Sequence, residues 1–205
     1  MINKIKLNII SNRKLCENEN LEKQIEKIFS AYEKKIILKN FEIVSLTLRE
    51  KDLDKNEYLN LVEKIYSICK KHKINLILHQ NYDLNLDDKY MIEGLHLSYE
   101  IFKSLNKNIR EGLIKKYKRI GISIHSIDEG KEVEMLGATY VVAGHIFETD
   151  CKKGLEPRGL NFIKKLSSTL TIPIFAIGGI DEKNSQSVID SGAFSVCMMS
   201  SLMKY

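Results

Sequence analysis

The sequence of 205 residues has few cysteines and none of them are closely paired. Its four cysteines, Cys16, Cys69, Cys151 and Cys197, form no CxxC motif. Zinc sites and redox-active dithiols use closely spaced cysteines, and small secreted folds use dense disulfide frameworks. The spacing therefore indicates neither a zinc site nor a disulfide framework, and it predicts free thiols.

Long apolar runs are also missing. The longest apolar stretches have the length of a strand, which is too short to cross a bilayer. Near the start of the chain, Lys4, Lys6 and Asn8 interrupt the apolar residues, unlike the core of a signal peptide. The sequence predicts a cytoplasmic protein that does not interact with membranes.

No block of like charge stands out, although 32 basic and 27 acidic residues give a net charge of +5. Lysine doublets occur at 34–35, 70–71, 115–116 and 164–165, near the ends of expected helices, where lysine complements the helix dipole. This dispersion argues against a nucleic-acid partner. The modest positive field favours small anionic substrates.

The hydrophobic pattern alternates between strand-like and helix-like segments along the whole chain. Strands are expected over 4–10, 42–48, 74–79, 94–97, 119–124, 139–144, 172–177 and 193–199. Helical segments are expected over 19–32, 55–71, 83–90, 109–116, 127–136, 160–170, 183–191 and 200–205. Eight alternations predict an α/β fold, a closed (β/α)8 TIM barrel formed by a single domain over residues 1–205. A doubly wound open sheet is the alternative.

The final helix of this pattern, 200–205, is very short. The side of the barrel that a full-length helix would cover therefore needs another cover. This predicts a homo-oligomer.

The stretch 172–180 ends in Gly178 and Gly179, and Asp181 follows as the expected N-cap of the next helix. Glycines allow backbone N–H groups to approach a ligand closely, and a helix N-terminus attracts anions. A phosphate site is predicted here. The alternative is an ordinary strand-to-helix turn.

Four of the five histidines, His79, His96, His125 and His145, are expected at the carboxyl ends of strands, where TIM barrels carry their active sites. His125 follows a strand directly and suits acid–base work near neutral pH. His79 and His96 are also compatible with polar residues that fill the barrel interior. His72 is expected on the surface with no role.

Basic residues also surround the expected mouth. Arg49 and Lys51 follow the second strand, and Lys152, Lys153 and Arg158 lie in the long irregular stretch 147–159. The planar fork of arginine matches a carboxylate or phosphate in two-point fashion. These residues are candidates to bind an anion, Arg49 above all, although Lys152 and Lys153 equally fit a solvated loop.

Six motifs carry a family resemblance. They are 47–51 (TLREK), 121–126 (GISIHS), 144–149 (GHIFET), 152–159 (KKGLEPRG), 176–180 (AIGGI) and 198–201 (MMSS). In order and spacing the chain resembles the thiamine phosphate synthase superfamily, and 144–159 resembles its thiazole tautomerase (TenI) branch. The resemblance implies an oligomeric TIM barrel of thiamine biosynthesis that binds a small phosphorylated thiazole.

Synthases of this superfamily join a pyrimidine diphosphate to a thiazole phosphate, using Mg²⁺ held by carboxylates. Here His79 and Gln80 stand at one metal-binding position and Ile101 at the other. These side chains do not supply the hard anionic oxygens that Mg²⁺ prefers. Asn81, Asp83 and Glu100 remain as shifted substitutes.

The missing carboxylates favour a thiazole tautomerase, an isomerase without cofactor or metal. The resemblance then implies that His125 moves the proton and that Gly178, Gly179, Ser200 and Ser201 bind the phosphate. Arg49, Lys51, His145 and Lys152 are further substrate-binding candidates. The alternatives are a Mg²⁺-dependent thiamine phosphate synthase and a non-catalytic regulator that binds a phosphate ester.

Overall fold

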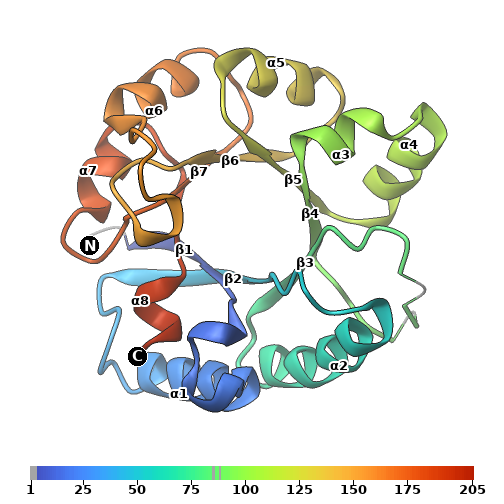
Figure 1. Ribbon diagram of the computed structural model, residues 1–205, viewed down its shortest axis with the longest axis vertical. Coiled ribbons are helices and arrows are strands. Elements are labelled where there is room, and N and C mark those ends of the chain that lie inside the picture. The colour runs from blue at the N-terminus through green and yellow to red at the C-terminus, as the bar shows by residue number, and fades with distance from the viewer. Residues whose placement is uncertain (1–3, 85, 88) are drawn as a thin grey trace.

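Eight parallel strands close into a barrel in the order β1 to β8, with helices around the outside (Figure 1). The computed structural model describes residues 4–84, 86–87 and 89–205. The strands are β1 (Ile5–Ile10), β2 (Phe41–Leu48), β3 (Asn75–His79), β4 (Gly94–Ser98), β5 (Arg119–Ile124), β6 (Tyr140–Gly144), β7 (Ile174–Ile177) and β8 (Ser195–Met198). The predicted TIM barrel is confirmed, and the open sheet is excluded because β1 pairs with β8.

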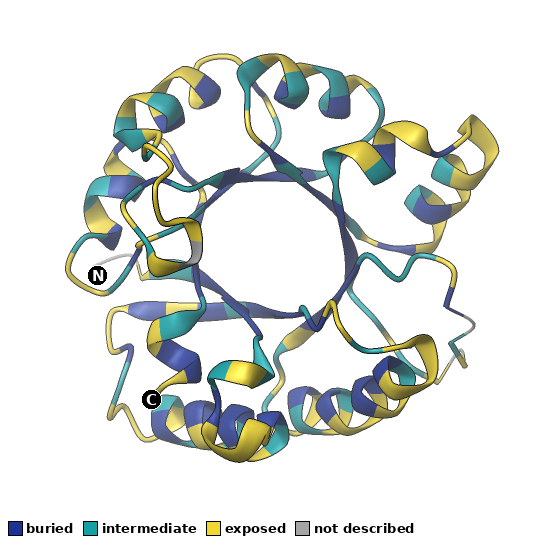
Figure 2. Cartoon of the chain, in the orientation of Figure 1, coloured by how far each residue is buried: buried dark blue, intermediate teal, exposed yellow. Residues whose placement is uncertain are grey.

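A helix follows each strand except β3, after which the described residues form none before β4, and two helices follow β4. The helices are α1 (Leu21–Glu33), α2 (Lys55–Lys71), α3 (Tyr99–Ser104), α4 (Lys107–Lys116), α5 (Ile127–Met135), α6 (Gly159–Ser167), α7 (Ser185–Asp190) and α8 (Ser200–Met203). Three short 3-10 helices add η1 (Arg13–Leu15), η2 (Glu17–Glu19) and η3 (Asp150–Lys152). The helices present buried residues to the strands and exposed residues to solvent (Figure 2).

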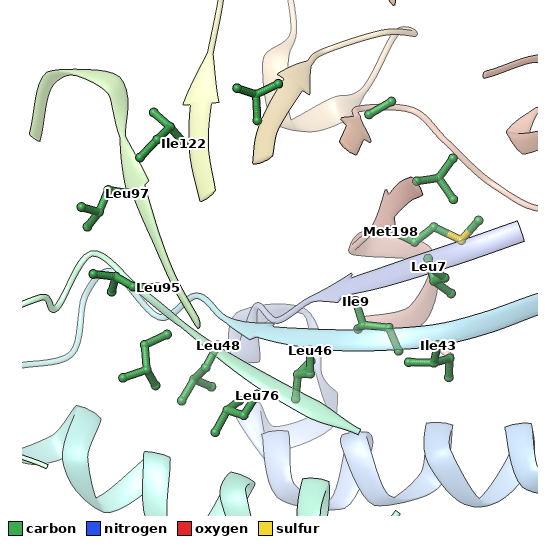
Figure 3. Packing of buried hydrophobic residues seen from close by; sticks show 14 of the residues in the cluster. Leu7, Ile9, Ile43, Leu46, Leu48, Leu76, Leu95, Leu97, Ile122 and Met198 are labelled. Atoms are coloured by element: carbon green, nitrogen blue, oxygen red, sulfur yellow. The ribbon is translucent and has the colours of Figure 1, made fainter. Parts of the chain in front are cut away.

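Side chains along each strand alternate between the helix layer and the barrel axis. In β2, Leu46 and Leu48 pack toward the helices (Figure 3), whereas Ser45 and Thr47 face the axis and hydrogen-bond to the Asn8 side chain. The outward residues build the main hydrophobic core. This alternation also fixes which residues beyond each strand end face the mouth.

The barrel interior is a second, smaller core with polar members. Its apolar residues are Ile10, Ile77, Tyr140, Val142, Phe175 and Cys197. The Tyr140 ring fills the space that Gly121 leaves on the neighbouring strand, where a Cβ would overlap it. The Tyr140 hydroxyl is buried and has no hydrogen-bond partner among the described residues.

Local capping explains where several helices begin. At α2 the Asp54 carboxylate accepts hydrogen bonds from the Asn56 and Glu57 amides, and the Glu57 carboxylate accepts one from the Asp54 amide. This reciprocal capping satisfies N–H groups that have no partner inside the helix. The predicted bounds of α2 agree with the structure.

Three local details differ from the prediction: one expected helix is not found, one observed helix was missed, and one helix begins later than expected. The brief helix expected over 83–90 is not found in the described part of that stretch, where residues 85 and 88 lie outside the description. Helix α3 was not predicted at all. Helix α7 begins at Ser185, two residues later than expected, and the Asp181 carboxylate accepts from the Lys183 and Asn184 amides in the turn that leads into it.

His72 is not a surface residue. Its ring lies between α1 and α2 with its side chain 4% exposed, 2.7 Å from Glu33 Oε1 through Nδ1 and 3.2 Å from Glu26 Oε1 through Nε2. It ties the two helices together through both ring nitrogens.

Helix α8 is short, as predicted, and a groove lies beside it. The groove is lined by Leu38, Met198, Leu202 and Tyr205 among others. The prediction that another copy of the chain covers this side stays a prediction. No helix in the described part of the chain is long and apolar enough to cross a membrane.

Candidate functional site

The carboxyl end of β2 brings two cations to the barrel mouth. Arg49 and Lys51 continue the axis-facing series of Ser45 and Thr47, so their side chains belong to the inner rim. Partial burial, followed by the nearby charges of Arg49 and Lys152, lowers the pKa of Lys51. Neighbouring cations repel one another, and a bound anion relieves that repulsion. The arrangement therefore suits a multiply charged anion.

Between these cations, Glu50 turns the other way and is buried, at 4% exposure. Its carboxylate accepts a hydrogen bond of 2.6 Å from the Ser11 hydroxyl and two of 3.1 Å from the Arg13 amide. Ser11 in turn accepts a 2.8 Å hydrogen bond from the Arg49 amide. The loop after β1 and the end of β2 are therefore tied through one buried carboxylate.

His79 and His96 lie inside the barrel beneath these cations. Their rings stack with centroids 5.6 Å apart, and His96 Nε2 is 2.7 Å from Ser123 Oγ. Burial above all, followed by the neighbouring His96 and by Arg49 and Lys51, lowers the pKa of His79 to about 2. Burial, with Arg49 and Lys51, lowers the pKa of His96 to about 3. Both imidazoles are neutral at physiological pH. His96 does not end a strand, because β4 continues to Ser98.

His125 lies on the rim directly after β5. It continues the axis-facing series of Gly121 and Ser123, and its side chain is 51% exposed. Its amide donates a 2.6 Å hydrogen bond to Glu129 Oε2, which also lies 3.7 Å from His125 Nδ1. The structure thus places His125 at the mouth, with a carboxylate beside its ring.

Across the mouth, Gly178 and Gly179 follow β7 with φ of 105° and 65°, which favour glycine. A Cβ on Gly178 would lie 2.6 Å from His145 Cα, and one on Gly179 would lie 2.8 Å from Phe147 Cβ. Neither glycine amide donates a hydrogen bond to any described residue. These two N–H groups remain available to a ligand.

The segment after β6 runs beside the end of β7 (Figure 1, orange), where the Ile146 and Phe147 amides donate to the Ile177 and Gly178 carbonyls. His145 Nε2 lies 3.1 Å from the Leu155 carbonyl oxygen, and Arg158 Nε donates a 3.1 Å hydrogen bond to the Gly144 carbonyl. His145 and Arg158 therefore hold the loop 147–159 in place. The loop carries Lys152 to within electrostatic reach of Lys51.

Ser200 and Ser201 begin α8, close to the end of β8. Ser201 also lines the groove beside α8.

The described residues do not fit the Mg²⁺ that the resemblance implies for a synthase. They contain no group of three or more His, Cys, Asp or Glu side chains arranged to hold a metal ion. Of the shifted substitutes, Asp83 pairs with Lys55 on α2 and Glu100 is exposed on α3. Asn81 donates to the His79 carbonyl oxygen.

Two site features were missed from the sequence: the Ser11–Glu50 connection and the carboxylate of Glu129 beside His125. Strand alternation offered a signal for the first. Glu50 shares the outward parity of Leu46 and Leu48, where a carboxylate needs buried partners. Glu129 lies four residues after His125, a spacing at which helical side chains meet.

Comparison with known proteins gives a consistent result. A family model described as thiamine monophosphate synthase matches residues 7–202. The thiamine-phosphate synthase of Clostridium acetobutylicum is 29% identical over 198 residues, covering 97% of this chain and 87% of the relative. That of Halalkalibacterium halodurans is 33% identical over 159 residues, covering 77% and 73%.

A solved structure agrees on the fold. Thiamine phosphate pyrophosphorylase from Pyrococcus furiosus has a TM-score of 0.78 at 22% identity, covering 99% of this chain and 89% of that chain.

These relatives are named for the synthase, so the prediction of a thiazole tautomerase is wrong and the transferase alternative is supported. The prediction relied on the resemblance of 144–159 to the tautomerase branch and on two substituted metal positions, whereas the similarity to the family extends over nearly the whole chain.

Proposed function

The chain belongs to the thiamine monophosphate synthase family, and from this premise we propose that it is a thiamine-phosphate synthase. The proposed reaction joins a pyrimidine diphosphate to a thiazole phosphate. A bond forms between the pyrimidine group and the thiazole as the bond between the pyrimidine group and the diphosphate breaks. The departing diphosphate keeps the electron pair of the broken bond. Catalysis then consists of positioning two anionic substrates and stabilising the leaving group.

The cluster of Arg49, Lys51 and Lys152 is the observation that carries this proposal. Partial burial, followed by the charges of Arg49 and Lys152, lowers the pKa of Lys51, and a bound anion would relieve the repulsion among the three cations. Diphosphate carries more charge than a monophosphate ester. We therefore assign the diphosphate to this cluster and the thiazole phosphate to the amides of Gly178, Gly179, Ser200 and Ser201.

His125 and His145 have different proposed roles. His125 faces the mouth, with Glu129 beside its ring, and contacts the substrates between the two anion sites. His145 acts through the loop: it keeps 147–159 over the mouth by its contact with Leu155. Closing a loop over the substrates excludes water from the leaving group.

We propose that coupling needs no bound cofactor or metal. The side-chain cations take the place of Mg²⁺ in neutralising the diphosphate. Cations held in place around a leaving group stabilise the negative charge that develops on it, as a bound metal ion does.

The proposed assembly is a homo-oligomer in which another copy covers the groove beside α8. Sedimentation at micromolar concentration tests this directly. A single species with the mass of one chain would contradict it.

The function is tested by supplying both substrates and following the coupled product by mass spectrometry, together with released diphosphate. We expect one diphosphate for each product molecule, and loss of both in Arg49→Ala. Product formation by Arg49→Ala at the wild-type rate, or no product from the wild type with or without Mg²⁺, would contradict the proposal.

A further inference from the structure

Glu50 is a buried carboxylate between two cations that face the substrate. Its side chain leaves the barrel axis, while Arg49 and Lys51 on either side face the mouth. An isolated buried carboxylate is strongly destabilising, so the protein keeps it only with a complete set of partners.

The partners of Glu50 all come from the loop after β1. Oε1 accepts from the Ser11 hydroxyl at 2.6 Å, and both oxygens accept from the Arg13 amide at 3.1 Å. The Arg13 guanidinium adds a 3.4 Å hydrogen bond to Oε2. The carboxylate is thus fixed from several directions and cannot turn without leaving donors unpaired.

Ser11 links this carboxylate to Arg49. It is fully buried, its hydroxyl donates a hydrogen bond to Glu50, and the same oxygen accepts one of 2.8 Å from the Arg49 amide. Its own amide donates a 3.0 Å hydrogen bond to the Thr47 carbonyl. The backbone of 47–50 is therefore clamped to the β1 loop on both sides of Leu48.

We propose that Glu50 is a positioning residue, which acts through Ser11 and the Arg49 backbone to hold the Arg49 and Lys51 side chains toward the anion at the mouth. The inference rests on the proposed function only in taking diphosphate as the ligand of these cations. Charged hydrogen bonds in a buried network are strong and directional, which suits such a clamp.

The direction in which Glu50→Gln changes anion affinity distinguishes a positioning role from a purely electrostatic one. Glu50→Gln removes a negative charge near an anion site, so Coulomb's law alone predicts tighter anion binding. Loss of positioning predicts weaker binding. Ser11→Ala changes no charge and should weaken binding through the same link.

The test is calorimetric titration of inorganic pyrophosphate, with thermal unfolding showing that each variant is folded. We expect Glu50→Gln and Ser11→Ala each to weaken pyrophosphate binding roughly tenfold, the scale of coupling within one hydrogen-bond network. The matched control is Asp52→Asn, which removes an exposed carboxylate from the same Arg13 guanidinium. It should bind pyrophosphate as tightly as the wild type or slightly more so.

A double-mutant cycle with Arg49→Ala completes the test. If Glu50 acts through both cations, Glu50→Gln should weaken binding less in the Arg49→Ala background than in the wild type, because only Lys51 is left to be displaced. Should Glu50→Gln fail to fold, Ser11→Ala in both backgrounds decides by the same criterion.

Affinity unchanged or increased in the folded variants, full additivity in the cycle, or no pyrophosphate binding by the wild type would overturn the inference. Pyrophosphate binding without coupling in the wild type would instead overturn the proposed synthase and leave this inference standing.

Discussion

The two sides of the barrel mouth offer an anion different kinds of partner. The rim after β2 offers long side-chain cations, Arg49 and Lys51, whose placement depends on a buried network. The rim after β7 offers backbone amides at Gly178 and Gly179, whose placement depends on the absence of side chains. The first arrangement can adapt to a large, highly charged group, and the second fits one compact phosphate.

The glycine side should be the more sensitive to a single added methyl group. Gly178→Ala would strain a backbone with φ of 105° and push against His145. We expect a loss of about 3 kcal/mol or more in the free energy of unfolding, together with loss of phosphate binding. Urea denaturation and titration with inorganic phosphate measure both.

Gly112→Ala is the matched control, because nothing lies within 4 Å of a Cβ at that helical position. It should stabilise the protein by about 0.5–1 kcal/mol. Equal behaviour of the two variants would remove the close-approach argument for Gly178.

The cationic side should lose affinity rather than stability. Arg49→Ala should weaken pyrophosphate binding by about tenfold to a hundredfold, since it removes charged hydrogen bonds. Binding of inorganic phosphate at the glycines should change less than about twofold if the sites are independent. Calorimetry measures both constants.

Lys107→Ala removes the same charge from an exposed site on α4 and serves as control. If it weakens pyrophosphate binding as much as Arg49→Ala, net charge rather than local contact explains the effect.

The histidines beneath the cationic side predict a pH dependence. The pKa values of His79 and His96 are lowered in the folded state, to about 2 and about 3. Below pH 6.5 the unfolded chain therefore binds more protons, so stability is complete above pH 6.5 and is lost as the pH falls toward the folded pKa values.

His96→Gln should lower the slope of the free energy of unfolding against pH by the contribution of one proton. That contribution is about 1.4 kcal/mol per pH unit between pH 6 and pH 4. Urea denaturation at several pH values gives the slope for each protein. Parallel stability curves for wild type and variant would contradict the burial of a neutral His96.

The smallest effect is expected in the barrel interior, below both sides of the mouth. Tyr140→Phe removes a buried hydroxyl that has no partner among the described residues. Stability should stay the same or rise by up to about 1 kcal/mol, because no hydrogen bond is lost. A clear loss in thermal denaturation would mean that the hydroxyl is paired in solution.

Regular periodicity made the barrel predictable, whereas contacts between distant segments did not show in the sequence. All eight strands were placed, because parallel barrel strands have strong apolar patterns. Helix α3 has six residues and only Phe102 fully buried, too little for a periodic signal. The bridge made by His72 to Glu26 and Glu33 spans about 40 positions and is set by helix packing.

In the candidate site, too, residues placed by strand alternation were predictable and contacts between distant segments were not. Strand ends indicated Arg49, Lys51, His125 and the two glycines, since side chains beyond a strand keep its alternation. The sequence could not show that His96 lies inside the barrel, because that depends on β4 continuing two residues further. Nor could it show that Glu50 meets Ser11, which requires the register between β1 and β2.

The most direct test of the two-sided mouth is a crystal structure of the protein grown with pyrophosphate and Mg²⁺. The account predicts pyrophosphate held by Arg49, Lys51 and Lys152, with no metal ion bridging it to the protein. A Mg²⁺ ion coordinated by Asn81, Asp83 or Glu100, or pyrophosphate bound only at Gly178 and Gly179, would contradict it.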